Sequence, residues 1–124
     1  MIIAIDFDGT LHTGEWPEIG APAPGAIKAM QRLKEDGHFL IIWTCREGNY
    51  EARMVNWLSE HGIPFDAINE HDPVSLPAFG YESRKVFADI YIDDHNVGGL
   101  PSWREIYDII SGKAKPYFIY KFLK

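Results

Sequence analysis

The first ten residues, Met1 to Thr10, constrain the fold more than any other stretch of the chain. An uninterrupted apolar run ends there in Asp6 and Asp8, which are followed by Gly9 and Thr10. A half-buried strand alternates apolar and polar residues, whereas a continuous apolar run predicts a strand buried on both faces, as in the middle of a parallel sheet. Open parallel sheets bind ligands just beyond the carboxyl ends of their strands. We therefore expect Asp6 and Asp8 to lie where such a fold places its chemistry.

The spacing of these two acids adds a second constraint. Asp6 and Asp8 are separated by one residue, so while the chain stays extended their side chains point to the same side. Two carboxylates held that close repel each other. The repulsion raises the pKa of at least one of them and favours either a shared proton or a divalent cation.

Length and charge limit the classes of protein to consider. The chain has 124 residues, which predicts one domain over residues 1–124. Its net charge of −6 disfavours a protein that holds nucleic acid or an anionic membrane by bulk electrostatics. Cys45 is the single cysteine, so no internal disulfide can form and a reducing compartment is favoured. No apolar run approaches the ~20 residues of a membrane helix, and we expect a cytoplasmic location without membrane contact.

Strand-like and helix-like stretches alternate along the sequence. Apolar runs predict strands at residues 1–5, 38–43, 65–69 and 88–92. Helices are expected from Pro24 as first helical residue to a stop at Gly37, from a cap at Asn49 to a stop at Gly62, and from a capping box at Ser102 through about Ile110. Residues 70–84 are expected to form an irregular loop, and residues 117–123 an edge strand or a helix end. The alternation predicts an α/β fold with a parallel sheet and right-handed crossovers.

Three of the predicted strands end in residues capable of chemistry. Asp6 and Asp8 follow the first strand, Thr44 the second, and Asp93 with Asp94 the fourth. Carboxylates from two strand ends suit a hard, oxygen-preferring ion such as Mg²⁺. The Thr44 hydroxyl can donate to an anionic oxygen, and Lys85, just before the fourth strand, can neutralise negative charge. Such a set is equipped to attack phosphorus through a carboxylate, with a second carboxylate moving the proton.

This set resembles the four motifs of the haloacid dehalogenase superfamily of phosphohydrolases, in the same order, over residues 1 to about 99. The resemblance implies a three-layer Rossmann-like fold with a mainly parallel central sheet. It also implies Mg²⁺ as cofactor and an aspartyl-phosphate intermediate on Asp6, with Asp8 as general acid/base. The metal would be held by Asp6, the Asp8 backbone carbonyl, Asp94 as the main fourth-motif ligand and Asp93 in support. The phosphoryl oxygens would be bound by Thr44, Lys85 and Gly9.

Members of this superfamily usually carry cap domains over the site. Residues 11–43 and 45–84 leave no room for a folded cap, so this chain resembles a minimal, capless member. An open site implies a bulky substrate or a partner subunit that serves as lid, as in a homo-oligomer. The nearest flap would be the loop 11–22, whose Trp16 and His12 are candidate substrate contacts. Arg46 is a further candidate contact, although a surface charge near a helix start is its expected role.

Several functions fit these residues. A phosphatase acting on a small phosphomonoester, such as a sugar phosphate, is the first hypothesis. Phosphoryl transfer to another acceptor and hydrolysis at nucleic-acid ends use the same fold, and the −6 charge weighs against the latter. A phosphorylatable receiver domain has a similar inventory, but it places its acidic pair first and its phosphorylated aspartate mid-sheet. Here the presumed nucleophile comes first and the acidic pair last.

Overall fold

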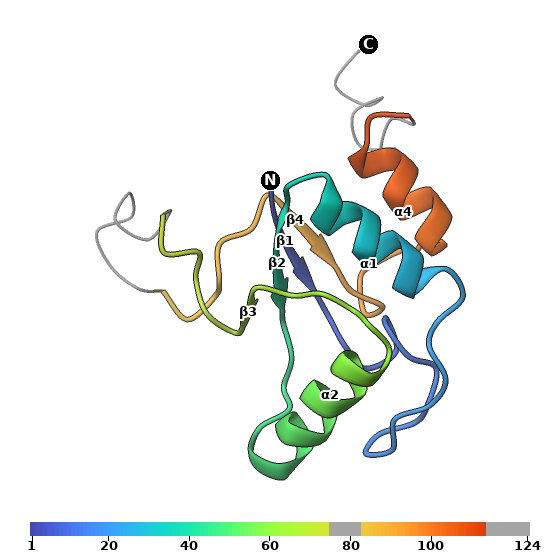
Figure 1. The fold of residues 1–124 in the computed structure, drawn as a ribbon, viewed down its shortest axis with the longest axis vertical. Coiled ribbons are helices and arrows are strands. Elements are labelled where there is room, and N and C mark those ends of the chain that lie inside the picture. The colour runs from blue at the N-terminus through green and yellow to red at the C-terminus, as the bar shows by residue number, and fades with distance from the viewer. Residues whose placement is uncertain (75–82, 114–124) are drawn as a thin grey trace.

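The computed structural model describes residues 1–74 and 83–113. Within them, four parallel strands form one sheet in the order β3-β2-β1-β4 (Figure 1). The strands are β1 (Ile2–Ile5), β2 (Phe39–Ile42), β3 (Ala67–Ile68) and β4 (Ile90–Ile92). This confirms the predicted α/β, Rossmann-like fold with its parallel sheet, and β1 occupies the interior position that its unbroken apolar run predicts.

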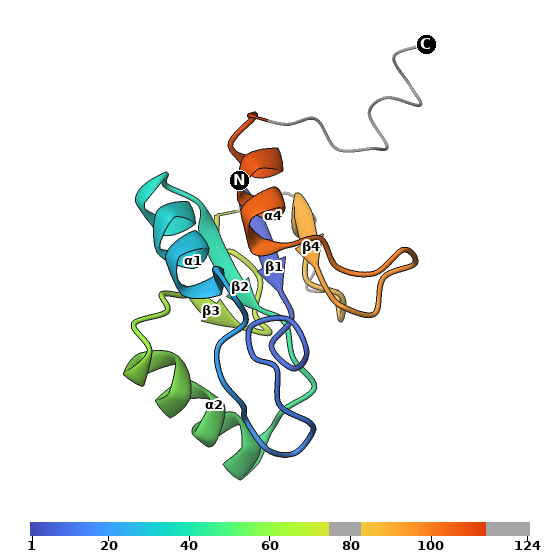
Figure 2. The same cartoon turned by 90° about the vertical axis from the view of Figure 1, so that its right-hand side faces the viewer.

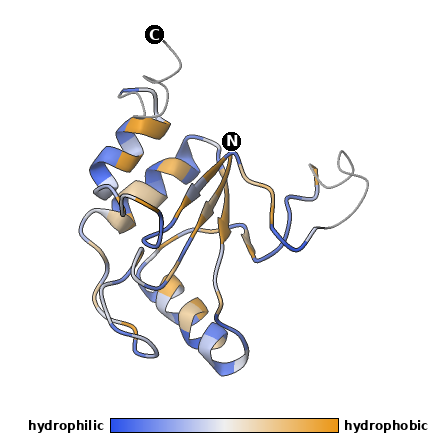
Figure 3. Cartoon of the chain, turned by 180° about the vertical axis from the view of Figure 1, so that it is seen from behind, coloured by the Kyte–Doolittle hydropathy of each residue, from blue (hydrophilic) through white to orange (hydrophobic). Residues whose placement is uncertain are grey.

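The described helices are α1 (Ala26–Glu35), α2 (Gly48–Glu60) and α4 (Trp103–Ile110). Their buried side chains share one cluster with Ile3 and Ile5 of β1, so the three helices pack against the same face of the sheet. Figure 1 and Figure 2 show α1 and α4 side by side on that face. On the opposite face, Ile2 and Ala4 pack with Val86 and Ala88 of the segment that precedes β4. Apolar residues dominate the strands, as Figure 3 shows, because they have a cluster to pack against on either side.

The sheet register brings the strand ends to one edge. Ile5 of β1 pairs with Ile42 of β2 on one side and with Ile92 of β4 on the other. The pairing continues past the strands, since the Asp6 N–H donates to the Ile92 carbonyl at 2.9 Å. The residues that follow β1, β2 and β4 therefore meet at the carboxyl edge of the sheet.

The element ends differ from the sequence prediction in three places. Helix α1 begins at Ala26 after Gly25, whose φ of 79° is in the left-handed region, rather than at Pro24. Helix α2 is preceded by Glu47, so Asn49 lies in its first turn and the predicted cap is wrong. Strand β3 is shorter than predicted. The predicted helix start at Ser102 is confirmed, because Ser102 is the N-cap of α4 and its hydroxyl accepts a hydrogen bond from the Glu105 N–H at 3.1 Å. The predicted element at 117–123 lies outside the described residues, as does most of the predicted loop 70–84.

The segment between β1 and α1 folds into a narrow hairpin-like flap, here called the flap (residues 11–23). The Ala23 N–H donates to the Leu11 carbonyl at 2.8 Å, and the Thr13 N–H donates to the Ala21 carbonyl at 3.0 Å. Near its tip the backbones of Gly14 and Gly20 approach so closely that a Cβ on either would collide with the other. The loop predicted here is thus an ordered structure. Among the described helices, none is long and apolar enough to cross a membrane.

Candidate functional site

Three carboxylates meet at the carboxyl edge of the sheet. Asp6 follows β1, and Asp93 with Asp94 follows the adjacent strand β4. Each offers an oxygen atom, and these atoms lie within 4.8 Å of one another. We call this group the acidic cluster. The sequence prediction that these three residues come together is confirmed.

Thr10 links two members of the acidic cluster, Asp6 and Asp94, by hydrogen bonds. Its side chain is fully buried, and its hydroxyl lies 3.2 Å from Asp6 Oδ2 and 3.4 Å from Asp94 Oδ1. The same hydroxyl oxygen accepts a hydrogen bond from the Asp94 N–H at 3.2 Å. A hydroxyl has one proton to donate, so it serves one of the two carboxylates at a time. Thr10 therefore fixes the separation between the ends of β1 and β4.

Gly9 has a steric role in the same place. Its φ of 78° is in the left-handed region, which a residue with a Cβ enters at a cost. A Cβ at this position would collide with the Asp94 carboxylate. Glycine therefore lets Asp94 approach the turn after β1.

The electrostatics of the acidic cluster favour a cation. Burial raises the pKa of Asp6 from its ordinary value of 3.8 to about 8, assisted by a hydrogen bond with Asp94 and by the negative charges of Asp93 and Asp94, while the Thr10 hydroxyl opposes the shift. Without a cation, the acidic cluster thus keeps a proton to a higher pH than a free carboxyl group does. Three convergent carboxylates are a donor set that suits a hard divalent ion.

Asp8 lies close in sequence but has entirely different partners. Arg46 binds its carboxylate in a bidentate pair, with Nε donating to Oδ2 at 2.8 Å and Nη2 to Oδ1 at 2.7 Å. His12 Nε2 lies 2.8 Å from the same Oδ1. Burial alone would raise the pKa of Asp8, but the hydrogen bonds from Arg46 and His12 and the charge of Arg46 outweigh it, so the pKa is lowered. We call this group, Asp8 with Arg46 and His12, the clamp.

The hydrogen bonds of His12 define its tautomer. Its Nδ1 accepts from the Gly14 N–H at 3.0 Å and from the Gly20 N–H at 3.1 Å, so Nδ1 carries no proton. The proton is then on Nε2, which donates to Asp8. Through these bonds His12 joins the tip of the flap to Asp8.

Arg46 is buried, with a relative exposure of 1%, which overturns the expectation of a surface charge near a helix start. Besides Asp8, its Nη2 donates to the Pro17 carbonyl at 3.0 Å. Its guanidinium carbon lies 4.7 Å from the Trp16 ring centroid and 5.3 Å from that of Phe7. Arg46 therefore holds the flap against the sheet edge as well as holding Asp8.

A pocket of about 380 Å³ opens over these groups. Its lining includes Asp6 and Asp93 of the acidic cluster, Asp8 of the clamp, and Trp16 from the flap. The Trp16 ring is 56% exposed and lies 4.9 Å from the ring of Tyr50, which is on α2. Of the three candidate substrate contacts, Arg46 and His12 are buried and Trp16 faces the pocket.

Thr44 lies in the turn after β2, as predicted. Its N–H donates to Asn69 Oδ1 at 2.8 Å, and its carbonyl accepts from Asn69 Nδ2 at 2.7 Å. The Thr44 hydroxyl accepts from the Arg46 N–H at 3.0 Å. Asn69 thus fixes the Thr44 backbone. Its own backbone adopts a φ of 53°, which is in the left-handed region. The role of the Thr44 hydroxyl toward phosphate stays a prediction.

Lys85 is not brought next to the acidic cluster. Its Nζ lies 4.8 Å from the ring centroid of Tyr91, and it lines a separate pocket with Val86 and Phe87. That pocket shares no lining residue with the one over Asp6. A phosphate-binding role for Lys85 stays a prediction that this geometry does not support.

Two contributions to the site were missed from the sequence. The sequence places Thr10 in the first motif, and only its spacing of four residues from Asp6 in a tight turn indicates that the two side chains meet. The pairing of Arg46 with Asp8 links positions 38 residues apart, and no local pattern signals it.

Comparison with known proteins supports the fold and names no activity. A solved structure of a conserved protein from Bacteroides thetaiotaomicron matches with a TM-score of 0.82 and 40% sequence identity, covering 93% of each chain. The Drosophila melanogaster protein retinal degeneration B is 27% identical over 97 residues, which is 78% of this chain but only 7% of the length of that protein. No model of a known protein family matches the chain.

Proposed function

This chain belongs to the same family as the conserved Bacteroides thetaiotaomicron protein, and from the geometry of its acidic cluster we propose that it is a magnesium-dependent phosphatase of the haloacid dehalogenase type. Its substrate is a phosphomonoester and its intermediate an aspartyl-phosphate on Asp6. The observation that carries the proposal is the convergence of Asp6, Asp93 and Asp94 at the carboxyl edge of a parallel sheet.

Asp6 is the nucleophile in this proposal. It lies at the end of the interior strand β1, with one carboxylate oxygen held by Thr10. Asp6, Asp93 and Asp94 would hold Mg²⁺, which supplies positive charge to offset the carboxylates and the oxygens of the transferring phosphoryl group. With that charge present, the Asp6 carboxylate is ionised and can attack phosphorus. Attack breaks the bond to the ester oxygen and leaves the phosphoryl group on Asp6.

Asp8 moves the proton. The clamp keeps its carboxylate ionised and fixed at the pocket wall, which suits a base that takes a proton from the water attacking the phosphorylated Asp6. The proton taken from that water stays on the Asp8 carboxyl group and is given to the departing alcohol of the next turnover. Arg46 and His12 are positioning residues here, since both are buried and act through Asp8.

The pocket favours a small phosphorylated substrate. Trp16 and Tyr50 provide exposed aromatic faces beside the acidic groups, and such faces pack against sugar rings and planar groups. The net charge of −6 disfavours nucleic-acid ends. A partner subunit could close the pocket from the solvent side.

A phosphate-release screen tests the proposal. Sugar phosphates, nucleotides and phosphorylated DNA ends are offered with Mg²⁺ or with EDTA, using Asp6→Asn as blank and Glu60→Gln, an exposed carboxylate on α2, as matched control. We expect release that needs Mg²⁺, is lost in Asp6→Asn and is unchanged in Glu60→Gln. Release that survives in Asp6→Asn would refute the proposal.

Leaving groups test the role of Asp8. A nitrophenyl ester needs no proton on departure, whereas an alkyl ester does. Asp8→Asn should therefore slow an alkyl phosphate more than a nitrophenyl phosphate. Equal losses on both esters would remove the acid role from Asp8.

A further inference from the structure

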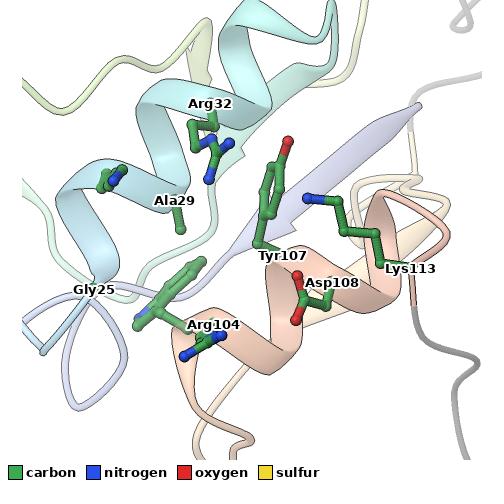
Figure 4. A pocket seen from close by; sticks show the side chains of 9 residues that line it. Gly25, Ala29, Arg32, Arg104, Tyr107, Asp108 and Lys113 are labelled. Carbon is green, nitrogen blue, oxygen red and sulfur yellow. The ribbon is translucent and has the colours of Figure 1, made fainter.

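A further cavity, of about 530 Å³, lies between α1 and α4 (Figure 4). Its charged lining is mostly basic: Lys28 and Arg32 from α1, Arg104 from α4, and Lys113 just after α4, with Asp108 as the one acid. We call it the basic cavity. It shares no lining residue with the pocket over Asp6. Its charge is opposite to that of the chain as a whole, whose net charge is −6.

Within the part of the chain that the structure describes, no ion pair involves a cation of the basic cavity. In residues 1–74 and 83–113, the ion pairs of Lys and Arg involve Lys34, Arg46 and Arg53, and none involves the four cations of the cavity. Four cations with one acid in the same lining, Asp108, repel one another, so the arrangement costs stability in the absence of a ligand. A cavity with unmatched positive charge is suited to an anion.

Tyr107 organises the wall of the cavity. Figure 4 shows its ring between Arg32 and Lys113, with the guanidinium carbon 4.9 Å and the Lys113 Nζ 5.6 Å from the ring centroid. The Tyr107 hydroxyl donates to Asp36 Oδ2 at 2.8 Å, which fixes the ring. Cation–π contacts of this kind hold both cations in place without neutralising them.

The floor of the cavity is buried and is connected to the acidic cluster. Trp103 lines the cavity and is 2% exposed, and its Nε1 donates to the Thr10 carbonyl at 2.9 Å. Thr10 in turn contacts Asp6 and Asp94. A ligand in the basic cavity would therefore rest on a fixed surface rather than on a mobile loop.

We propose that the basic cavity binds a small phosphorylated polyanion, with at least two phosphate charges. Cavities of ~300–1,000 Å³ take small molecules, and this volume lies in that range. Arg32 and Arg104, one from each helix, can each present a planar pair of donors to phosphate oxygens. Asp108 would accept a hydrogen bond from a ligand hydroxyl but repel a further phosphate. The phosphate groups of the ligand would therefore lie beside the lysines and arginines of the cavity, away from Asp108. The proposal is independent of phosphatase activity at Asp6.

Binding of inorganic pyrophosphate in EDTA tests it, measured by titration calorimetry on the full chain. Without a divalent ion the acidic cluster repels the probe, so the heat reports the basic cavity. We expect Arg32→Gln and Arg104→Gln each to weaken binding about three- to fivefold, the size expected of one exposed charge pair. The double variant should lose about tenfold or more. Arg53→Gln, which removes one exposed cation from α2, is the matched control and should bind like the native chain.

Two results with these variants would overturn the proposal. One is a double variant whose unfolding temperature equals that of the native chain and that still binds pyrophosphate as tightly as the native chain does. The other is an equal loss in Arg53→Gln, which would reduce the effect to overall charge. Competition with a DNA duplex and with tripolyphosphate separates the two ligand classes. If the duplex displaces pyrophosphate at a lower concentration than tripolyphosphate does, the ligand is nucleic acid and the proposal is equally overturned.

Discussion

Asp6 and Asp8 are chemically identical, lie two positions apart, and line the same pocket, yet their surroundings are opposite. Asp6 lies among acids, and burial with the neighbouring carboxylates raises its pKa to about 8. Asp8 lies against a buried arginine and a histidine, and despite burial its pKa is lowered. One carboxylate is thus short of positive charge and the other already has it.

This difference divides the chemistry between the two residues. The acidic cluster has a deficit of positive charge that a divalent cation can fill. In the proposed mechanism it holds the metal, and Asp6 carries the phosphoryl group. The clamp satisfies Asp8 with protein groups, so Asp8 has no such deficit, and in the proposed mechanism its ionised carboxylate is the base. The two residues are of the same type, so the proposed roles of nucleophile and base follow from their neighbours. Those neighbours come from distant parts of the chain: Asp93 and Asp94 for Asp6, and Arg46 for Asp8.

The largest effect is expected from removing the nucleophile. Asp6→Asn should lower phosphate release by at least about a thousandfold, because an amide does not attack phosphorus. In the metal-free protein the same change should not destabilise the fold, since it removes a carboxyl group from a cluster of acids. Phosphate release with the matched Glu60→Gln variant, together with thermal unfolding of both, checks this. Activity within tenfold of native would contradict it.

Removing the proton carrier should cost less. Asp8→Asn should lower turnover of an alkyl phosphate by about a hundred- to a thousandfold, the range of general acid–base catalysis. Asparagine keeps one acceptor oxygen for Arg46, while its amide nitrogen cannot accept, so thermal unfolding of the variant is measured beside its turnover. Turnover as low as that of Asp6→Asn on every ester would erase the distinction between the two residues.

Breaking the clamp should affect stability before chemistry. Arg46→Gln leaves the partly buried Asp8 without its bidentate partner and should cost about 2–3 kcal/mol of unfolding free energy. Arg53→Gln removes an exposed pair with Glu18 and should cost less than about 0.5 kcal/mol. Urea unfolding of the two variants measures the difference. Equal losses would mean that Arg46 does not support the fold through Asp8.

The two aspartates should also give opposite pH dependences in EDTA. The pKa of Asp6 is raised in the folded chain, so its contribution to stability is present below 3.8 and is lost as the pH rises toward about 8. The pKa of Asp8 is lowered, so its contribution is present above the ordinary value and is lost as the pH falls through the folded value. Urea unfolding from pH 4 to 9 should show a decline that Asp6→Asn flattens. The same decline in both proteins would assign it to other groups.

Sequence predicted the parts that depend on local pattern. The unbroken apolar runs of β1 and β2 identify interior parallel strands, and a parallel sheet must gather their carboxyl ends, which was enough to bring Asp6 together with Asp93 and Asp94. The capping box at Ser102 is equally local. These features follow from residues that are close in sequence or fixed by sheet topology.

The rest depends on tertiary contacts that no local pattern encodes. Arg46 looks like a surface charge in sequence, but the flap folds over it and pairs it with Asp8. Pro24 fits a helix start by its φ, yet the left-handed Gly25 places the first helical residue at Ala26. The basic cavity combines residues of α1 and α4, which are distant in sequence and adjacent only in the fold.

The most direct test of the divided roles is to trap the phosphorylated residue. Native protein is mixed with an alkyl phosphate and Mg²⁺, quenched in acid during turnover, and reduced with borohydride, which converts an acyl phosphate to an alcohol. Peptide mapping by mass spectrometry then locates the change. We predict reduction at position 6 and none at position 8. Reduction at position 8, or turnover with no reducible residue, would contradict Asp6 as the nucleophile.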